Sequence, residues 1–191
     1  MGRAKLNDGE LADRVLDLFR NYGYQGTTLS QIAEATGLEK ASLYYRYPGG
    51  KEAIVLAVAS RVGSWFEENV FHPLIVEGTP KERLDAVARS LREFYGDGER
   101  PCVLESLSLP GGPSELRFAL RQAMEQWLRA FTMLALEGGL GPDEAARGSE
   151  QALIDIEGSL VMGRVLGESR FFLRAIEELP KRLLAPRKGK R

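Results

Sequence analysis

Apolar residues recur at every third or fourth position along most of the chain, the spacing that places side chains on one face of an α-helix. No convincing run of alternating β-branched residues stands between turn residues. The pattern therefore predicts an all-α protein of about nine helices. These expected helices cover residues 7–22, 28–36, 39–47, 51–71, 81–95, 103–109, 114–136, 143–166 and 168–184.

The first two expected helices share a start motif, an Asn or Thr followed three residues later by Glu or Gln. It occurs as Asn7–Glu10 and as Thr28–Gln31, and in each pair the two side chains can satisfy each other's free backbone N–H groups. Gly23 and Gly37 are the expected stops. The first helix carries an apolar stripe of Leu11, Val15, Leu18, Phe19 and Tyr22.

Two short helices separated by a tight turn at Gly37 predict a helix-turn-helix. In this motif the first helix crosses the DNA backbone and the second lies in the major groove. Helices this short are marginal in water, so the helix at residues 7–22 should supply an apolar floor beneath both. Pro48-Gly49-Gly50 ends the second of them before a longer helix begins at Lys51.

The helix at residues 39–47 has one central apolar residue, Leu43, which should face the core and leave the opposite side to DNA. Lys40 can reach guanine or a phosphate, and Ala41 is small enough to approach a thymine methyl group. Lys51 should hold a phosphate from the start of the next helix. Hydroxyl groups suited to phosphate come from Thr28, Ser42, Tyr44 and Tyr45.

Over residues 7–56 the chain resembles the tetracycline-repressor-like family of bacterial regulators. The resemblance rests on Leu43-Tyr44-Tyr45-Arg46-Tyr47-Pro48-Gly49-Gly50-Lys51-Glu52-Ala53, preceded by Thr28, Ile32, Ala33, Gly37 and Leu38. The Pro-Gly-Gly-Lys variant resembles a branch near the lincomycin-resistance regulators. The resemblance implies backbone contacts from Thr28, Ser42, Tyr44 and Lys51, and positions nearer the bases for Lys40, Ala41 and Tyr45. Arg46 stands where the family often has His, so it can serve either a phosphate or a carboxylate of the protein.

The resemblance also implies a homodimer whose last two helices pair with those of a second copy, and a ligand-responsive repressor of a pseudo-palindromic operator. We expect a helix-turn-helix domain at 1–50, an effector-binding and dimerisation domain at 51–185 and a basic tail at 186–191. Small residues three and four apart after residue 143 can let another helix approach closely, either a partner's or one of the same subunit. The expected interface comprises Ala152, Ser159, Gly163, Gly167, Phe171, Phe172 and Ile176.

The middle helices contribute aromatic and soft side chains that can line a pocket for a small apolar or amphiphilic effector, or simply form the core. These side chains are Phe94, Cys102, Leu104, Leu107, Trp127, Phe131 and Met162. A bound effector would move the helix that starts at Lys51 and so change the distance between the two recognition helices.

The net charge of −1 is unevenly distributed, because residues 1–51 carry a balance of +1 and residues 52–185 a balance of −6. One Cys and one His exclude a disulfide framework and a zinc site within one chain, and we expect no metal, cofactor or catalytic residue. No apolar run is long enough for a membrane span, so a cytoplasmic protein is expected. The alternatives are a helical protein-interaction adaptor and, less favoured, a hydrolytic enzyme, for which no nucleophile or phosphate-loop motif is present.

Overall fold

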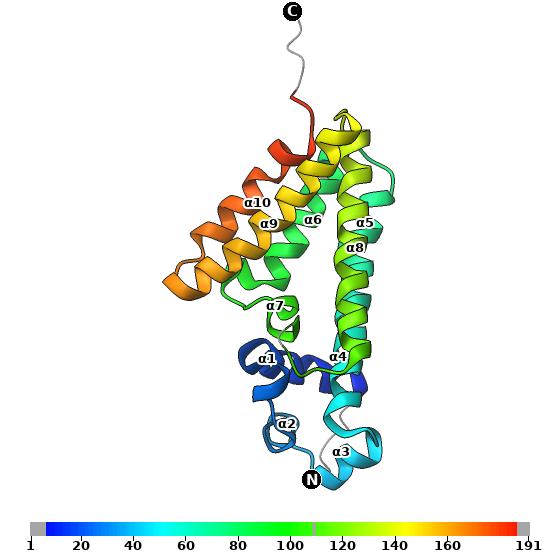
Figure 1. Cartoon of the computed structure of the whole chain (residues 1–191), viewed down its shortest axis with the longest axis vertical. Coiled ribbons are helices and arrows are strands. Elements are labelled where there is room, and N and C mark those ends of the chain that lie inside the picture. The colour runs from blue at the N-terminus through cyan, green and yellow to red at the C-terminus, as the bar shows by residue number, and fades with distance from the viewer. Residues whose placement is uncertain (1–6, 109, 187–191) are drawn as a thin grey trace, which may run out of the picture. The chain divides into compact units, whose positions relative to one another are not determined.

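A computed structural model describes residues 7–108 and 110–186, and every regular element within these ranges is helical (Figure 1). The α-helices are α1 (Asp8–Gly26), α2 (Leu29–Thr36), α3 (Lys40–Arg46), α4 (Gly50–Phe66), α5 (His72–Ile75), α6 (Pro80–Phe94), α7 (Val103–Ser108), α8 (Ser114–Glu137), α9 (Pro142–Leu166) and α10 (Arg170–Leu183). A π-helical turn, Glu67–Phe71, joins α4 to α5, and a 3₁₀ turn, Gly96–Gly98, follows α6. The predicted all-α class is confirmed.

The chain forms two compact units, and the division differs from the expected boundary at residue 50. One unit comprises Met1–Ser64 and Val103–Arg121, and the other comprises Trp65–Cys102 and Gln122–Arg191. The first unit thus includes most of α4 and also α7, which packs on α1. Ser106 of α7 donates a 2.7 Å hydrogen bond from its hydroxyl to the carbonyl oxygen of Arg20, and both residues are buried. A functional division at residue 50 remains a prediction.

The ends of the first two helices follow the predicted motifs. The Glu10 amide donates to Asn7 Oδ1 at 2.8 Å and the Asn7 amide donates to Glu10 Oε2 at 3.1 Å, so α1 begins with a complete capping box. Gly23 interrupts α1 with φ of 64°, a conformation that favours glycine. Tyr22, placed in the apolar stripe by its spacing, is 56% exposed, so that expectation is wrong. It directly precedes the break, and its side chain faces solvent instead of the core.

A proline at position 73 suggests that the long helix starting at Gly50 ends there. The structure shows that the helical path continues past Pro73. Hydrogen bonds shift to the i→i−5 pattern over Glu67–Phe71, where the His72 amide donates to the Glu67 carbonyl. The helix then resumes with Pro73 in the first turn of α5, a position that tolerates the missing N–H. The π-helical turn therefore lets the chain pass a proline without leaving the helical path.

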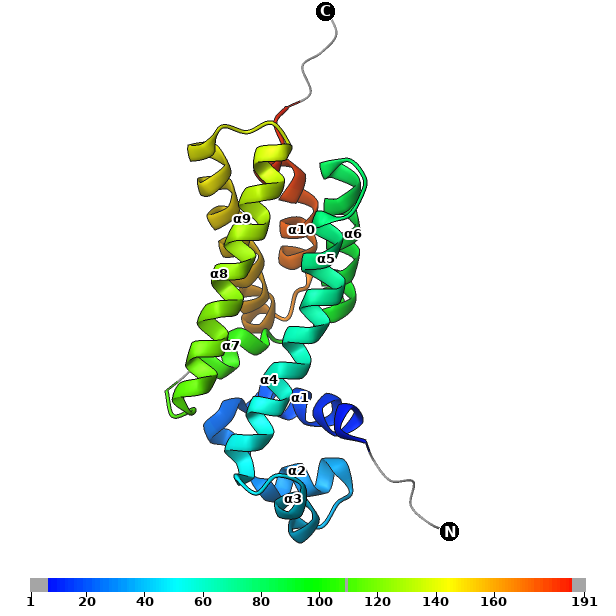
Figure 2. The same cartoon turned by 90° about the vertical axis from the view of Figure 1, so that its right-hand side faces the viewer.

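The second compact unit is a helical bundle in which α10 packs on α9 and α6 (Figure 2). Close approach of α9 and α10 depends on small side chains on α9. A Cβ added at Gly148 would lie 2.3 Å from the carbonyl oxygen of Arg182 in α10. Glycine is therefore required at Gly148 for these two helices to touch at their backbones.

Candidate nucleic-acid interface

Helix α3 buries one side chain, covers most of Arg46 at its last position and presents the other side chains to solvent. Leu43 is 1% exposed and is the buried residue of the helix. Lys40, Ala41 and Ser42 are exposed, while Tyr44 is 51% and Tyr45 91% exposed. A Tyr side chain left almost entirely in water on a helix this short has no role in packing. The structure therefore brings these predicted contact residues onto one free helical surface.

The turn before α3 has the geometry that a helix-turn-helix requires. Gly37 adopts the left-handed conformation, with φ of 68°, and its amide bonds to carbonyl groups at the end of α2. At the other end of α2 the Thr28 hydroxyl accepts from the Gln31 amide at 3.2 Å and lies 2.8 Å from Gln31 Oε1. The Thr28 hydroxyl is thus engaged in the helix cap, and a phosphate contact from Thr28 remains a prediction.

Lys51 has a role within the protein that sequence reasoning missed. Its ammonium group donates to the carbonyl oxygens of Tyr24 and Thr27, at 2.8 and 2.9 Å, and lies 4.3 Å from the centre of the Tyr24 ring. Burial lowers the pKa of Lys51 below its ordinary value. These bonds tie the first turn of α4 to the connection between α1 and α2. An ammonium group has three donors, so one N–H is left for the predicted phosphate contact.

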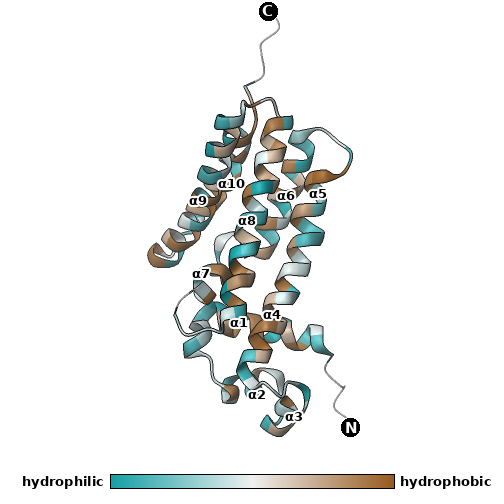
Figure 3. Cartoon of the chain, turned by 45° about the vertical axis from the view of Figure 1, so that its right-hand side comes forward, coloured by the Kyte–Doolittle hydropathy of each residue, from teal (hydrophilic) through white to brown (hydrophobic). Residues whose placement is uncertain are grey.

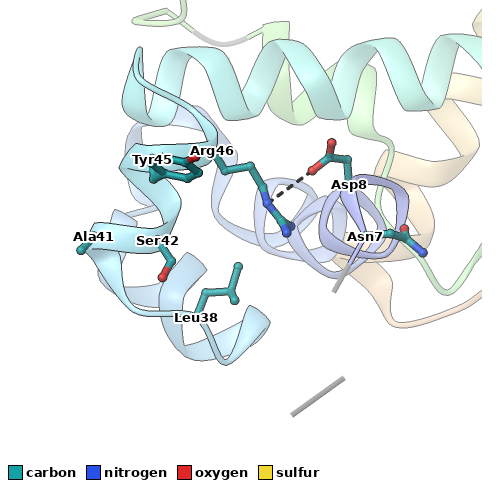
Figure 4. A pocket seen from close by; sticks show the side chains of 7 residues that line it. All are labelled: Asn7, Asp8, Leu38, Ala41, Ser42, Tyr45 and Arg46. Atoms are coloured by element: carbon teal, nitrogen blue, oxygen red, sulfur yellow. Dashed lines mark ion pairs between the residues drawn. The ribbon is translucent and has the colours of Figure 1, made fainter. Parts of the chain in front are cut away.

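Arg46 makes the intramolecular contact that was one of its two alternatives. Its Nε lies 3.5 Å from Asp8 Oδ1, at the start of α1, and its side chain is only 23% exposed. Tyr47 also hydrogen-bonds to Asp8, and burial together with this carboxylate raises the pKa of Tyr47. Arg46 and Asp8 line a groove of about 860 Å³ whose other lining residues are Asn7, Leu38, Ala41, Ser42 and Tyr45 (Figure 4).

The expected effector residues are distributed over both compact units. Phe94, Trp127 and Phe131 belong to a buried aromatic cluster in the second unit, with Phe66 4.9 Å from Phe94 and 5.3 Å from Trp127 between ring centroids. This cluster also includes Trp65, Phe71, Tyr95 and Phe172.

Cys102 is buried next to the cluster, with its sulfur 3.9 Å from the Tyr95 hydroxyl. Leu104 and Leu107 belong to the first unit, and Met162 is 47% exposed on α9. An effector site formed by the seven expected residues remains a prediction.

Most of the expected dimer residues face inward. The buried members of the set are Ala152, Ser159, Gly163, Phe172 and Ile176, and α9 packs there against α10 of the same chain. Gly167 ends α9 in the left-handed conformation, with φ of 69°, so its role is a helix cap. Phe171 lies on an outward groove together with Ser159, beside Gly158 and Met162. The described contacts of these small residues lie within the subunit, and a contact with a partner helix remains a prediction.

A different face of α9 is apolar and exposed. Ile154, Val161, Val165 and Leu166 are 62, 40, 77 and 54% exposed, and this end of α9 is strongly hydrophobic (Figure 3). A Cβ added at Gly158 would meet nothing within 4 Å. The recurrence of apolar residues at 154, 161 and 165 is visible in the sequence, but the buried face shows the same spacing.

Three further expectations concern the ends of the chain, metals and membranes. The tail cations Arg187, Lys188, Lys190 and Arg191 lie outside the described residues. Within residues 7–108 and 110–186, no three His, Cys, Asp or Glu side chains are grouped so as to hold a metal ion. In the same ranges no helix is both long and apolar enough to cross a membrane.

Comparison of the sequence with known proteins shows which proteins this helix-turn-helix segment resembles. Residues 13–58 match the family model described as "Bacterial regulatory proteins, tetR family". The transcriptional regulator LmrA of Bacillus subtilis is 25% identical over 167 residues, which are 81% of this chain and 86% of LmrA. The negative transcriptional regulator IcaR of Staphylococcus aureus is 28% identical over 106 residues, which are 56% of this chain and 55% of IcaR.

A solved structure of the TetR-family regulator CifR, a cysteine mutant complexed with a 26 bp operator DNA, shares the fold. It has a TM-score of 0.70 at 21% identity and covers 95% of this chain and 98% of its own. The family model matches the segment that contains α2, the Gly37 turn and α3. The relatives extend over most of the chain and are named as transcriptional regulators. Residues 13–58 thus match the tetR family of bacterial regulatory proteins, and the whole chain has the fold of its solved members.

Proposed function

We propose that this protein is a transcriptional repressor that binds a pseudo-palindromic operator as a homodimer and is released by a small apolar or amphiphilic effector. The observation that carries the proposal is the surface of α3, where one buried leucine holds the helix and the polar and aromatic side chains around it are exposed. IcaR is named a negative regulator, and the CifR structure is described as complexed with operator DNA. Both support repression through DNA binding.

Base reading is assigned to Lys40, Ala41 and Tyr45, and phosphate contacts to Thr28, Ser42, Tyr44 and Lys51. Ser42 and Tyr45 line the groove beside α3, so a duplex lying against that groove would meet both kinds of side chain. A dimer would place two such helices at half-sites about 34–36 Å apart, one turn of DNA. With a balance of only +1 in residues 1–51, a single module has little excess charge for binding, which favours a dimer.

The operator can be obtained by selecting duplexes from a randomised pool and measuring affinity by fluorescence anisotropy at several salt concentrations. A repressor of this kind enriches a two-fold symmetric sequence, and its affinity falls steeply as salt rises. Tyr45→Ala should abolish the preference for the selected duplex, while Tyr22→Ala, another exposed tyrosine, serves as the matched control. A wild-type protein that enriches no sequence would refute the proposal and favour a protein-interaction adaptor.

The exposed apolar face of α9 is our candidate for the dimer contact. It replaces the residues expected from the sequence, and Gly158 at its centre leaves room for a partner helix. Gly158→Glu introduces no clash within the subunit but would place a charge in the contact, so sedimentation should show monomers. Gly158→Ala is the control and should remain dimeric. A dimer that persists in Gly158→Glu would place the interface elsewhere.

The effector is assigned to the second compact unit, which contains the aromatic cluster. Both tryptophans of the chain, Trp65 and Trp127, lie in this cluster, so a ligand that binds there should change the intrinsic fluorescence. Differential affinity for two states is what would couple such binding to DNA release. A ligand that changes the fluorescence without lowering operator affinity would contradict the regulatory part of the proposal.

A further inference from the structure

The recognition helix is weakly anchored for an element that must present side chains in register. Helix α3 has seven residues and one buried side chain, and its N-cap residue, Glu39, makes no capping hydrogen bond from its side chain. At its other end, however, two consecutive residues reach the same acceptor. Arg46 forms an ion pair with Asp8, and Tyr47 hydrogen-bonds to it. The start of α1 thus holds the end of α3.

We propose that Asp8 is a positioning residue that keeps Arg46 from the DNA backbone and thereby sets the selectivity of the protein for its operator. The inference rests on the proposed DNA binding and adds to it a role for a residue outside the helix-turn-helix. Arg46 lies on the side of α3 that also presents Ala41, Ser42 and Tyr45 to the groove (Figure 4). Its guanidinium group therefore lies beside the surface that meets DNA.

The Asp8 carboxylate affects how readily the Arg46 guanidinium group can bind a DNA phosphate. An arginine without an acidic partner at a DNA surface binds any phosphate, whatever the base sequence, and such contacts raise affinity for all duplexes alike. The Asp8 carboxylate offers Arg46 an anion within the protein, and a phosphate must compete with it. Asp8 also occupies the first turn of α1, where the free N–H groups of the helix stabilise its negative charge. Discrimination then depends on the base-reading side chains.

The test compares salt titrations of wild type, Asp8→Asn, Arg46→Gln and the double variant, each on the selected operator and on an unrelated duplex of equal length. Asp8→Asn should bind the unrelated duplex about five- to tenfold more tightly at 0.1 M salt, with a slope of log K against log[salt] steeper by about 0.9, the value for one added phosphate contact. Its preference for the operator should fall by a similar factor. The double variant should return to the wild-type slope.

Two further variants separate positioning from folding. Asp8→Glu keeps the carboxylate and should retain the wild-type slope and preference. Arg46→Gln alone should leave the slope unchanged, because in the wild-type protein Arg46 does not contact a DNA phosphate. A slope that falls by about 0.9 in Arg46→Gln would overturn the proposal, as would an Asp8→Asn protein with wild-type slope and selectivity. If Asp8→Asn does not fold, the salt slope of Arg46→Gln alone decides whether the proposal stands. A wild type without operator preference refutes the proposed function instead.

Discussion

The ammonium group of Lys51 offers the sharpest test of how the DNA-binding unit is held together. Lys51→Met keeps the aliphatic stem and removes the charge that bonds to the Tyr24 and Thr27 carbonyl oxygens. A charged group contributes about 1.5–3 kcal/mol per net hydrogen bond. Lys51 is only partly buried, so water can replace some of the loss. We therefore expect the free energy of unfolding to fall by about 2 kcal/mol in total.

The measurement is urea unfolding followed by circular dichroism and by tryptophan fluorescence. Both tryptophans belong to the second compact unit, while Lys51 belongs to the first, so a transition confined to the first unit would appear in the dichroism alone. Lys81→Met is the matched control, because Lys81 is half exposed and pairs with Asp85 across one helical turn, an interaction of about 0.5 kcal/mol or less. Equal stabilities for the two variants would refute the assignment of Lys51 as a structural tie.

Three further outcomes are expected. Leu43→Ala should destabilise the protein by about 2–5 kcal/mol in urea unfolding, whereas Tyr45→Ala should change stability by less than about 0.5 kcal/mol. Ser106→Ala removes the buried bond to the Arg20 carbonyl and should cost about 1 kcal/mol by the same assay, with no change if that bond is unimportant. Because the pKa of Tyr47 is raised above 10.0, its contribution to stability is complete below pH 10 and is lost as the pH rises through the folded-state value. Urea titrations from pH 8 to 11.5 should show a shallower loss in Tyr47→Phe, and identical curves would contradict the assignment.

Interactions between near neighbours in the sequence could be predicted. The caps at Asn7 and Thr28 and the turn at Gly37 each involve residues three or four apart, so the order of residue types is enough to locate them. The same holds for the single inward side chain of α3, Leu43, since one turn of helix fixes which residues share its face. These local features were sufficient to predict the helix-turn-helix.

Interactions between distant residues could not be predicted. Nothing in the sequence links Asp8 to Arg46, 38 positions away, and a lysine after glycines has the same appearance whether it meets a carbonyl or a phosphate. The small residues of α9 failed as predictors for a related reason. Spacing shows that a face can accept another helix, but the identity of that helix depends on the tertiary arrangement, as Gly148 against the Arg182 carbonyl illustrates.

The burial of a single side chain of α3, Leu43, has an evolutionary consequence. Exposed positions such as Lys40, Ala41 and Tyr45 carry little folding free energy, so each can be exchanged for about 0.5 kcal/mol or less. Under the proposed base-reading roles of these residues, a lineage can change the DNA sequence it prefers, one substitution at a time, without first accumulating stabilising mutations elsewhere. Folding of the helix then depends on Leu43 and the proposed DNA preference on its exposed neighbours, so a duplicated copy can acquire a new operator.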